Sequence, residues 1–252
     1  MATTIGKSSF SVHDHLMDIV ERGEVDAIIK MLENGLDPDY PICQYGCLLN
    51  AAIVLDRDEL IDPLLHLYAN VNVSGYMGKT SVSLPVIKGK QDIVQKLLWY
   101  GADIEIQDYN DNCLLGEAIR SQNYNIVVDL IQASIDIFQS DSSMLYGCAA
   151  QLALTTNQLS LMETLINLGD NLAIKDICGK NILDFCVECF QRDVFSTETT
   201  FTTFQYLMSQ GARVSDMRHY PYINTDFFMH GNQILLNMLL DIGLRFKLVP
   251  DA

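Results

Sequence analysis

Residues 68–103 read YANVNVSGYMGKTSVSLPVIKGKQDIVQKLLWYGAD, and this stretch begins and ends on the same kind of short signal. Tyr68-Ala69-Asn70 opens it, and Gly101-Ala102-Asp103 starts 33 residues later. The same step leads back to Gly35-Leu36-Asp37 and forward to Ser134-Ile135-Asp136. Four equally spaced signals of this kind predict that the chain is built from an internal repeat.

One complete copy of the repeat lies inside this stretch. It runs Gly78-Lys79-Thr80-Ser81-Val82-Ser83-Leu84-Pro85-Val86 and then places Gly89, Ile93-Val94, Leu97-Leu98 and Gly101-Ala102-Asp103 without a gap. This spacing resembles the ankyrin repeat, whose 33-residue unit carries T-P-L-H-x-A in its first helix. The resemblance implies an all-α fold, an ankyrin-repeat solenoid of helix-turn-helix units with short finger loops or hairpins between them.

The resemblance covers nearly the whole chain as about seven units, and the later copies need insertions. Gly169-Asp170-Asn171, Gly211-Ala212-Arg213 and Gly243-Leu244-Arg245 mark the ends of those copies. Residues 1–12 are expected to form a flexible leader, and residues 13–252 a single elongated repeat domain. Its approximate units are 13–44, 45–77, 78–110, 111–145, 146–178, 179–219 and 220–252.

Prolines and polar segments divide the predicted units into elements. Residues 37–46, DPDYPICQYG, contain two prolines that exclude a helix, so an extended finger is expected there. Pro63 and Pro85 each fall early in a predicted helix, where a missing backbone N–H costs least. About nine extra residues, within QRDVFSTETT at 191–200, separate the two helices of the sixth unit. They are predicted either to extend a helix or to project as a loop.

Two positions that join neighbouring units in the ankyrin pattern are changed in this chain. The His of the pattern is replaced by residues such as Asn50, Gly116 and Gln151. Cys47 and Cys113 stand where the pattern has Thr. Because cysteine is a weak hydrogen-bonding group, the starts of those helices are expected to be less firmly held. The changes affect the expected stability of the array and leave its topology as it is.

The chain is strongly acidic, with a formal net charge of -16 and a pI of about 4.5. Such a charge repels phosphate backbones and anionic lipid, so neither nucleic acid nor a membrane is an expected partner. It would speed association with a basic partner protein, although the same charge also keeps an apolar repeat protein soluble. The expected partner is therefore another protein, a basic one being a candidate. The oligomeric state stays open, with a monomer favoured.

The cysteines and the first residues bear on the compartment. The chain has seven scattered cysteines, which do not form the pattern of a secreted disulfide framework. The opening MATTIGKSSFSV lacks the apolar core of a signal peptide, and no apolar run is long enough to span a bilayer. A cytoplasmic, reducing location is expected.

Candidate chemistry is sparse in this sequence. Cys186 and Cys189 have the C-x-x-C spacing of redox or zinc pairs, but Cys186 falls on a small core position of the repeat. Gly78-Lys79-Thr80 lacks the earlier glycine of a phosphate loop, because position 73 is Val73. We therefore expect no metal, no cofactor and no enzymatic activity. The alternative is an enzyme or enzyme subunit whose chemistry would come from Asp184, Glu188, Cys189 and Asp193.

Aromatic residues recur at the predicted turns between units, where they would form a row along adjacent fingers. Tyrosine offers a large, rigid contact surface and is enriched in binding hot spots, although each ring can equally pack on its own finger. First-helix positions would line the same concave side, with Leu84 and Ile87 either exposed or turned into the core. The predicted partner-binding residues are Tyr45, Tyr76, Met77, Tyr109, Asn110, Tyr146, Leu84, Ile87, Lys88, Glu117, Arg120, Arg218, His219 and Tyr220.

The resemblance implies a non-catalytic protein–protein interaction module that binds its partner through the concave face and the finger tips. One alternative is an acidic inhibitor or immunity-type protein that neutralises a basic enzyme or toxin. Another is a viral or bacterial effector adaptor that is delivered into a host cell. The fold by itself does not name the partner.

Overall fold

The structure, a computed structural model, describes residues 12–137, 149–176, 178–213 and 237. These residues are mostly helical, and their contacts divide the chain into two compact units, Met1–Tyr109 and Asn110–Ala252. Within the described part, no helix has both the length and the apolar character needed to cross a membrane. The predicted leader 1–12, apart from Val12, lies outside the described residues, as does the predicted unit 220–252 apart from Asn237.

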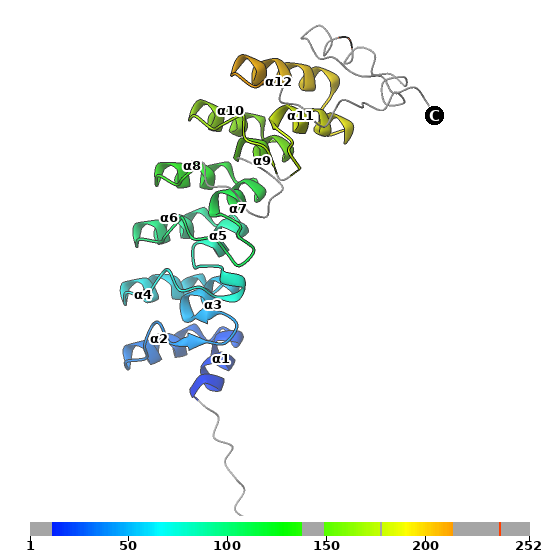
Figure 1. The fold of residues 1–252 in the computed structure, drawn as a ribbon. Coiled ribbons are helices and arrows are strands. Elements are labelled where there is room, and N and C mark those ends of the chain that lie inside the picture. Colours follow the sequence, from blue (N-terminus) through cyan, green and yellow to red (C-terminus); the bar gives the residue numbers. More distant parts are fainter. Residues whose placement is uncertain (1–11, 138–148, 177, 214–236, 238–252) are drawn as a thin grey trace, which may run out of the picture. The chain divides into compact units, whose positions relative to one another are not determined.

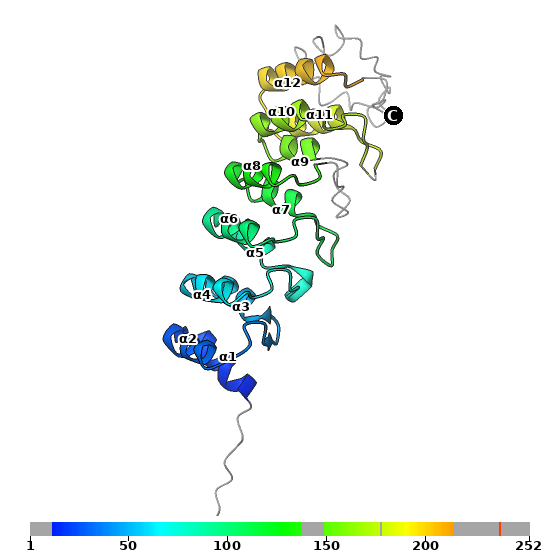
Figure 2. The same ribbon diagram turned by 90° about the vertical axis from the view of Figure 1, so that its left-hand side faces the viewer.

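Unit 1 is built from successive antiparallel helix pairs. The pairs are α1 (Val12–Arg22) with α2 (Val25–Glu33), α3 (Leu48–Val54) with α4 (Ile61–His66), and α5 (Ser83–Lys88) with α6 (Gln91–Trp99). A 3₁₀ turn, η1 (Asp58–Leu60), leads into α4. Within this unit α3 packs against both α4 and α5, so the first helix of one pair contacts the first helix of the next. Figures 1 and 2 show α1, α3 and α5 along one side of unit 1, and α2, α4 and α6 along the other.

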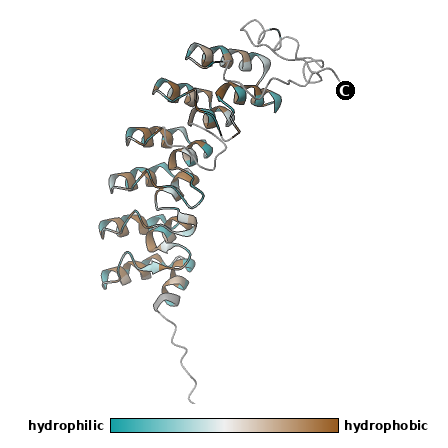
Figure 3. Ribbon diagram, in the orientation of Figure 1, coloured by the Kyte–Doolittle hydropathy of each residue, from teal (hydrophilic) through white to brown (hydrophobic). Residues whose placement is uncertain are grey.

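An apolar stripe on each helix of unit 1 forms the core between the pairs. Leu16, Ile28, Leu49, Leu64 and Leu97 are fully buried. Polar residues occupy the opposite faces, so the helices in Figure 3 carry both brown and teal segments. This alternation is the 3.6-residue periodicity of helices with one face in a core.

The finger between the first two helix pairs is a short β-hairpin. β1 (Pro41–Ile42) pairs antiparallel with β2 (Gly46–Cys47), and Pro41 lies opposite Cys47. The prediction that residues 37–46 exclude a helix is confirmed. Pro63 and Pro85 are each the third residue of their helices, α4 and α5, also as predicted.

Short polar side chains join the base of each finger of unit 1 to the next. Asp39 Oδ1 accepts a hydrogen bond from the Asn70 backbone N–H at 2.7 Å. Asn72 Oδ1 accepts one from the Asp103 N–H at 2.8 Å. Because both acceptors recur with the repeat, successive fingers of this unit lie next to one another.

Unit 2 repeats the same arrangement. Its helix pairs are α7 (Leu114–Arg120) with α8 (Tyr124–Gln132), α9 (Ala149–Thr155) with α10 (Leu159–Asn167), and α11 (Ile182–Gln191) with α12 (Thr197–Ser209). Helix α9 packs against α7 on one side and α11 on the other. The labels in Figure 1 allow these pairs to be followed within the unit.

Side chains at several helix starts accept hydrogen bonds from backbone N–H groups. Cys47 Sγ accepts a hydrogen bond from Asn50 N–H at 3.5 Å, and Cys113 Sγ accepts one from Gly116 N–H at 3.3 Å. Asn181 and Asp184 form a reciprocal capping box at the start of α11.

The extra residues of the sixth predicted unit extend a helix. Helix α11 runs on to Gln191, and α12 starts at Thr197, where Ser196 Oγ accepts a hydrogen bond from Thr199 N–H. Between them Phe195 is buried, with 4% of its surface exposed. The sequence left open whether these residues extend a helix or project as a loop. Residues 197–200 extend a helix, and a short turn anchored by Phe195 contains residues 192–196.

Candidate functional site

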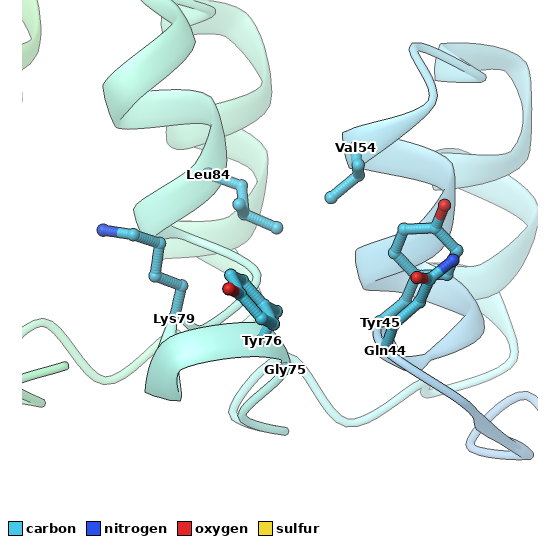
Figure 4. A pocket seen from close by; sticks show the side chains of 7 residues that line it. All are labelled: Gln44, Tyr45, Val54, Gly75, Tyr76, Lys79 and Leu84. Carbon is cyan, nitrogen blue, oxygen red and sulfur yellow. The ribbon is translucent and has the colours of Figure 1, made fainter. Parts of the chain in front are cut away.

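An apolar groove lies between α3 and α5 in unit 1. Its volume is about 360 Å³. In Figure 4, Val54 and Leu84 point toward one another from the two helices, and Tyr45 and Tyr76 approach from the two turns below them. The lining residues are Gln44, Tyr45, Val54, Gly75, Tyr76, Lys79 and Leu84.

The two turns that carry Tyr45 and Tyr76 approach one another at glycine. A side chain at Gly46 would place its Cβ 2.6 Å from the Ser74 carbonyl oxygen, and one at Gly75 would collide with the Tyr45 carbonyl oxygen. Gly46 also has a φ of 85°, a left-handed conformation that glycine adopts without strain. The floor of the groove therefore depends on glycine at both positions.

Asn50 fastens the second turn to α3. Its Nδ2 donates to the Val73 carbonyl at 3.0 Å, and its Oδ1 accepts from the Ser81 hydroxyl at 2.6 Å. Asn50 and Ser81 are both buried, so these bonds form in a medium of low dielectric constant, where an unpaired polar group is costly. The groove is consequently a preformed feature of unit 1.

The second turn is fixed from the next finger as well. It contains the 3₁₀ turn η2 (Tyr76–Gly78), in which Met77 has a left-handed φ of 60°. The Tyr109 N–H donates to the Met77 carbonyl at 2.9 Å. The Tyr109 ring lies against Gly78, where a Cβ would come within 2.5 Å of its Cδ1 atom. Lys79 Nζ pairs with the buried Asp108 carboxylate at 3.1 Å, so its stem and not its charge borders the groove.

The tyrosines predicted to contact a partner differ in how much of their surface is exposed. Tyr76 and Tyr109 are 73% and 75% exposed, whereas Tyr45 is half-buried. Met77 and Leu84 are also half-buried, and Ile87 is exposed. For Leu84 and Ile87 the structure decides between the alternatives, since neither side chain is turned fully into the core.

Lys88, another predicted contact residue, binds within the chain. Its Nζ donates to the Ile53 and Val54 carbonyls at 2.9 and 2.8 Å, and to Asp56 Oδ1 at 2.8 Å. The ammonium group thus caps the C-terminal end of α3, where the helix carries partial negative charge. Its position beside Val54 makes Lys88 a support of the groove wall.

The remaining predicted residues lie in unit 2 or outside the described residues. Asn110 is exposed, and Arg120 contacts Glu117 at 3.8 Å and the Asn112 amide oxygen at 3.4 Å. Four predicted contact residues have no described position: Tyr146, Arg218, His219 and Tyr220.

Sequence reasoning missed several residues that the structure makes prominent. Gln44, Val54 and Lys79 line the groove, and Trp99 and Tyr68 are each 86% exposed at the ends of second helices. The sequence contained features that could have drawn attention to Trp99 and Tyr68. Trp99 is the only tryptophan of the chain, and Tyr68 stands where most other copies of the repeat have glycine.

Two carboxylates considered for chemistry, Asp184 and Glu188, have partners within unit 2. Asp184 accepts a hydrogen bond from the Asn181 N–H at 2.8 Å, and Glu188 pairs with Lys180 at 2.7 Å. Burial raises the pKa of Cys189 to about 11 and raises the pKa of Cys186 as well, so both thiols stay protonated at neutral pH. The prediction that Cys186 packs in the core is confirmed. The described residues contain no group of three or more His, Cys, Asp or Glu side chains placed to hold a metal ion.

Comparisons with known proteins give one informative similarity. No family model matches the chain. The chain is 28% identical over 173 residues to the potassium channel AKT2/3 of Arabidopsis thaliana, a channel that carries ankyrin repeats. The matched region covers 68% of this chain and 21% of the channel, so the chain spans about a fifth of that relative's length. The similarity suggests an ankyrin-like chain and leaves the repeat number open.

Proposed function

We propose that this chain is a non-catalytic repeat protein of the ankyrin type that binds another protein through the α3–α5 groove. The observation that carries the proposal is the convergence of Tyr45, Tyr76 and Leu84 on one apolar cavity of about 360 Å³. A pocket of this size, lined by aromatic and aliphatic side chains with few polar groups, suits a protruding side chain of a partner.

The ankyrin assignment is supported by three features that point the same way. The sequence repeats at 33 residues, the helix pairs within each unit stack through their first helices, and the similarity to an ankyrin-containing channel covers two thirds of the chain. The finger between the first two pairs is a β-hairpin, as expected for such units. A single continuous solenoid over residues 13–252 is part of this proposal.

The groove is suited to binding because its parts are held before a partner arrives. Asn50 fixes the turn that carries Tyr76, and Lys88 closes the end of α3 beside Val54. Preorganisation lowers the entropy cost of association, since the side chains that form the contact are already ordered. The tyrosine hydroxyl groups then supply polar contacts around an apolar centre.

The direct experiment identifies the protein that copurifies with the chain and measures its affinity for variants. Tyr76→Ala is expected to weaken binding by about 1 to 3 kcal/mol, because a hot-spot ring is removed. Stability should change little, since the Tyr76 side chain is 73% exposed. Tyr124→Ala, which removes an exposed ring from α8 in unit 2, is the matched control. Wild-type affinity in the Tyr76→Ala variant would refute the groove as the binding site.

The net charge of -16 supports a second, more specific function, that of an acidic inhibitor of a basic enzyme or toxin. Electrostatic complementarity of this kind acts mainly on the association rate and is screened by salt. Steep loss of partner binding between low and physiological salt would support the inhibitor, and binding indifferent to salt would remove it.

We also infer a reducing compartment, the cytoplasm, as the place of action. The six cysteines among the described residues are free thiols, and Cys47, Cys113, Cys186 and Cys189 are buried. Oxidation of buried thiols would require the core to open. Thiol titration of protein isolated from its source is expected to find all cysteines reduced, and finding disulfides would contradict this location.

A further inference from the structure

A second exposed surface lies at the C-terminal ends of α4 and α6, away from every residue that lines the groove. Its two largest members, Tyr68 and Trp99, are each 86% exposed, and Leu67 and Tyr100 are 45% and 37% exposed. Large aromatic side chains usually bury most of their surface, and exposed apolar clusters commonly mark interaction sites. We call these four residues the aromatic edge: Leu67, Tyr68, Trp99 and Tyr100.

The two halves of the aromatic edge are neighbours, although they come from different helix pairs. Asn72 Nδ2 donates to the Gly101 carbonyl at 3.3 Å, which joins the segments that follow Tyr68 and Trp99. Lys96 of α6 pairs with Asp62 of α4 at 2.8 Å. Residues three apart share one side of a helix, so Trp99 lies on the same side of α6 as Lys96. The tryptophan is therefore on the border between α6 and α4.

Tyr68 keeps a large exposed ring at a backbone position that favours glycine. Tyr68 has a left-handed φ of 60° at the position where Gly35 and Gly101, with φ of 94° and 82°, end the other second helices of unit 1. A residue with a side chain is strained in this conformation, which glycine adopts readily. Because Tyr68 is almost fully exposed, burial of the ring does not offset the strain. Ser134, at the same repeat position in unit 2, also has a left-handed φ, of 68°, so the exposed aromatic ring and not the backbone alone distinguishes Tyr68.

The electrostatic surroundings of the aromatic edge favour a cation. The C-terminal ends of α4 and α6 carry the partial negative charge of their last carbonyl groups. Asp103 and Glu105 follow Trp99 closely and are exposed, and Asp39 lies at the base of the preceding finger, bonded to Asn70. The nearby positive charge of Lys96 is neutralised by Asp62. Aromatic faces add the negative side of their quadrupole to this field.

We propose that the aromatic edge binds an arginine-containing basic segment of a partner protein, with guanidinium groups stacking on Tyr68 and Trp99. A guanidinium ion is planar and weakly hydrated, so it stacks on exposed rings better than the ammonium group of lysine does. The apolar stems of the same segment would cover Leu67 and Tyr100. This surface is separate from the α3–α5 groove and does not depend on the function proposed for it.

The fluorescence of the full-length chain provides a direct test, because Trp99 is its only tryptophan. An octa-arginine peptide and an octa-lysine peptide are titrated in turn at physiological salt. Saturable change in Trp99 emission is expected, with the arginine peptide binding about threefold or more tightly. Equal affinity for the two peptides, or binding seen by calorimetry without any response of Trp99, would show that bulk negative charge alone attracts them and would overturn the proposal.

The decisive variant is Tyr68→Gly, which keeps the fluorescent reporter and gives the left-handed position its usual residue. Its affinity for the arginine peptide should fall about three- to tenfold, and the preference over lysine should shrink, while stability stays the same or rises. Tyr76→Ala and Tyr124→Ala should leave peptide binding unchanged, which separates this surface from the groove. Unchanged affinity in Tyr68→Gly, or a loss of stability together with affinity, would show a solvated or structural ring and refute the proposal.

Discussion

At the scale of single residues, amide side chains do the joining that the ankyrin pattern assigns to histidine. Asn50 Nδ2 donates to the carbonyl of Val73, 23 residues on, and Gln151 Nε2 donates to the carbonyl of Ile174, also 23 residues on. The equal spacing shows that the two contacts are equivalent in the two units. Sequence reasoning recognised the loss of histidine but missed that an amide N–H at this position can bond a carbonyl of the following finger.

Replacing the buried Asn50 tests this role. Asn50→Leu leaves the Val73 carbonyl and the Ser81 hydroxyl without their partner, so a loss of about 1 to 3 kcal/mol in the free energy of unfolding is expected. Urea denaturation measures the loss. Asn34→Ala, which removes only an exposed bond to Lys30 within a helix end, should cost far less. Equal losses in the two variants would contradict the bridging role of Asn50.

Two adjacent leucines of α6 differ in burial, and truncating them should cost different amounts of stability. Leu97 is fully buried and Leu98 is half-buried. Leu97→Ala should lower the free energy of unfolding by about 2 to 5 kcal/mol, because it leaves a cavity. Leu98→Ala should cost clearly less, as measured by urea denaturation. The reverse order would mean that α6 is rotated from its described orientation.

At the scale of elements, ion pairs connect the second helix pair of unit 1 to the third. Asp56 contacts Lys88 at 2.8 Å and Lys90 at 2.7 Å, Lys90 also contacts Asp58, and Lys96 contacts Asp62. All three lysines belong to the later pair and all three carboxylates to the earlier one. Exposed pairs of this kind are individually weak, but these form a network between two helix pairs, in which their contributions to stability can add.

The Asp56 cluster makes the stability of unit 1 sensitive to acid. Hydrogen bonds from Lys88 and then Lys90 lower the pKa of the Asp56 carboxyl group from 3.8 to about 2. The folded-state pKa is below the unfolded value, so ionised Asp56 contributes to the stability of the folded chain. That stabilisation is complete above about pH 4 to 5 and is lost as the pH falls toward 2. Asp56→Asn should therefore destabilise the chain at pH 6, and the difference from wild type should fade near pH 2.

Urea midpoints of both proteins across this pH range measure the effect. Glu59→Gln, a change of charge at an exposed neighbouring position, is the control and should show no such convergence. A constant difference between Asp56→Asn and wild type at every pH would mean that the pairing contributes nothing. High salt should reduce the difference at pH 6, since the groups are exposed to solvent.

At the scale of the whole molecule, the chain consists of two compact units with the same internal plan. Contacts within Met1–Tyr109 and within Asn110–Ala252 dominate, as expected where each helix pair touches mainly its neighbours in the chain. Such a molecule need not unfold in a single cooperative step. Its two proposed binding surfaces, the groove and the aromatic edge, both belong to unit 1.

Local cooperativity can be measured with thiols as reporters. Leu97→Ala should destabilise unit 1 while leaving the protection of the buried Cys186 and Cys189 in unit 2 largely unchanged. Mass spectrometry after brief thiol labelling at increasing urea follows Cys47 and the two unit 2 cysteines separately. A parallel shift of all three midpoints would show that the molecule unfolds as one unit.

The sequence by itself determined the helix pairs, their 33-residue spacing and the helix-free finger, because periodicity, prolines and glycines act over short distances along the chain. It also indicated Tyr45, Tyr76 and Leu84 as contact residues. Only the tertiary structure decided that these three share a cavity, that Lys88 is bound internally and that Tyr68 and Trp99 are exposed at the ends of neighbouring helices. Those facts depend on close backbone approaches, such as that between Gly46 and Ser74, and on side-chain directions between residues about 30 positions apart, which no local pattern encodes.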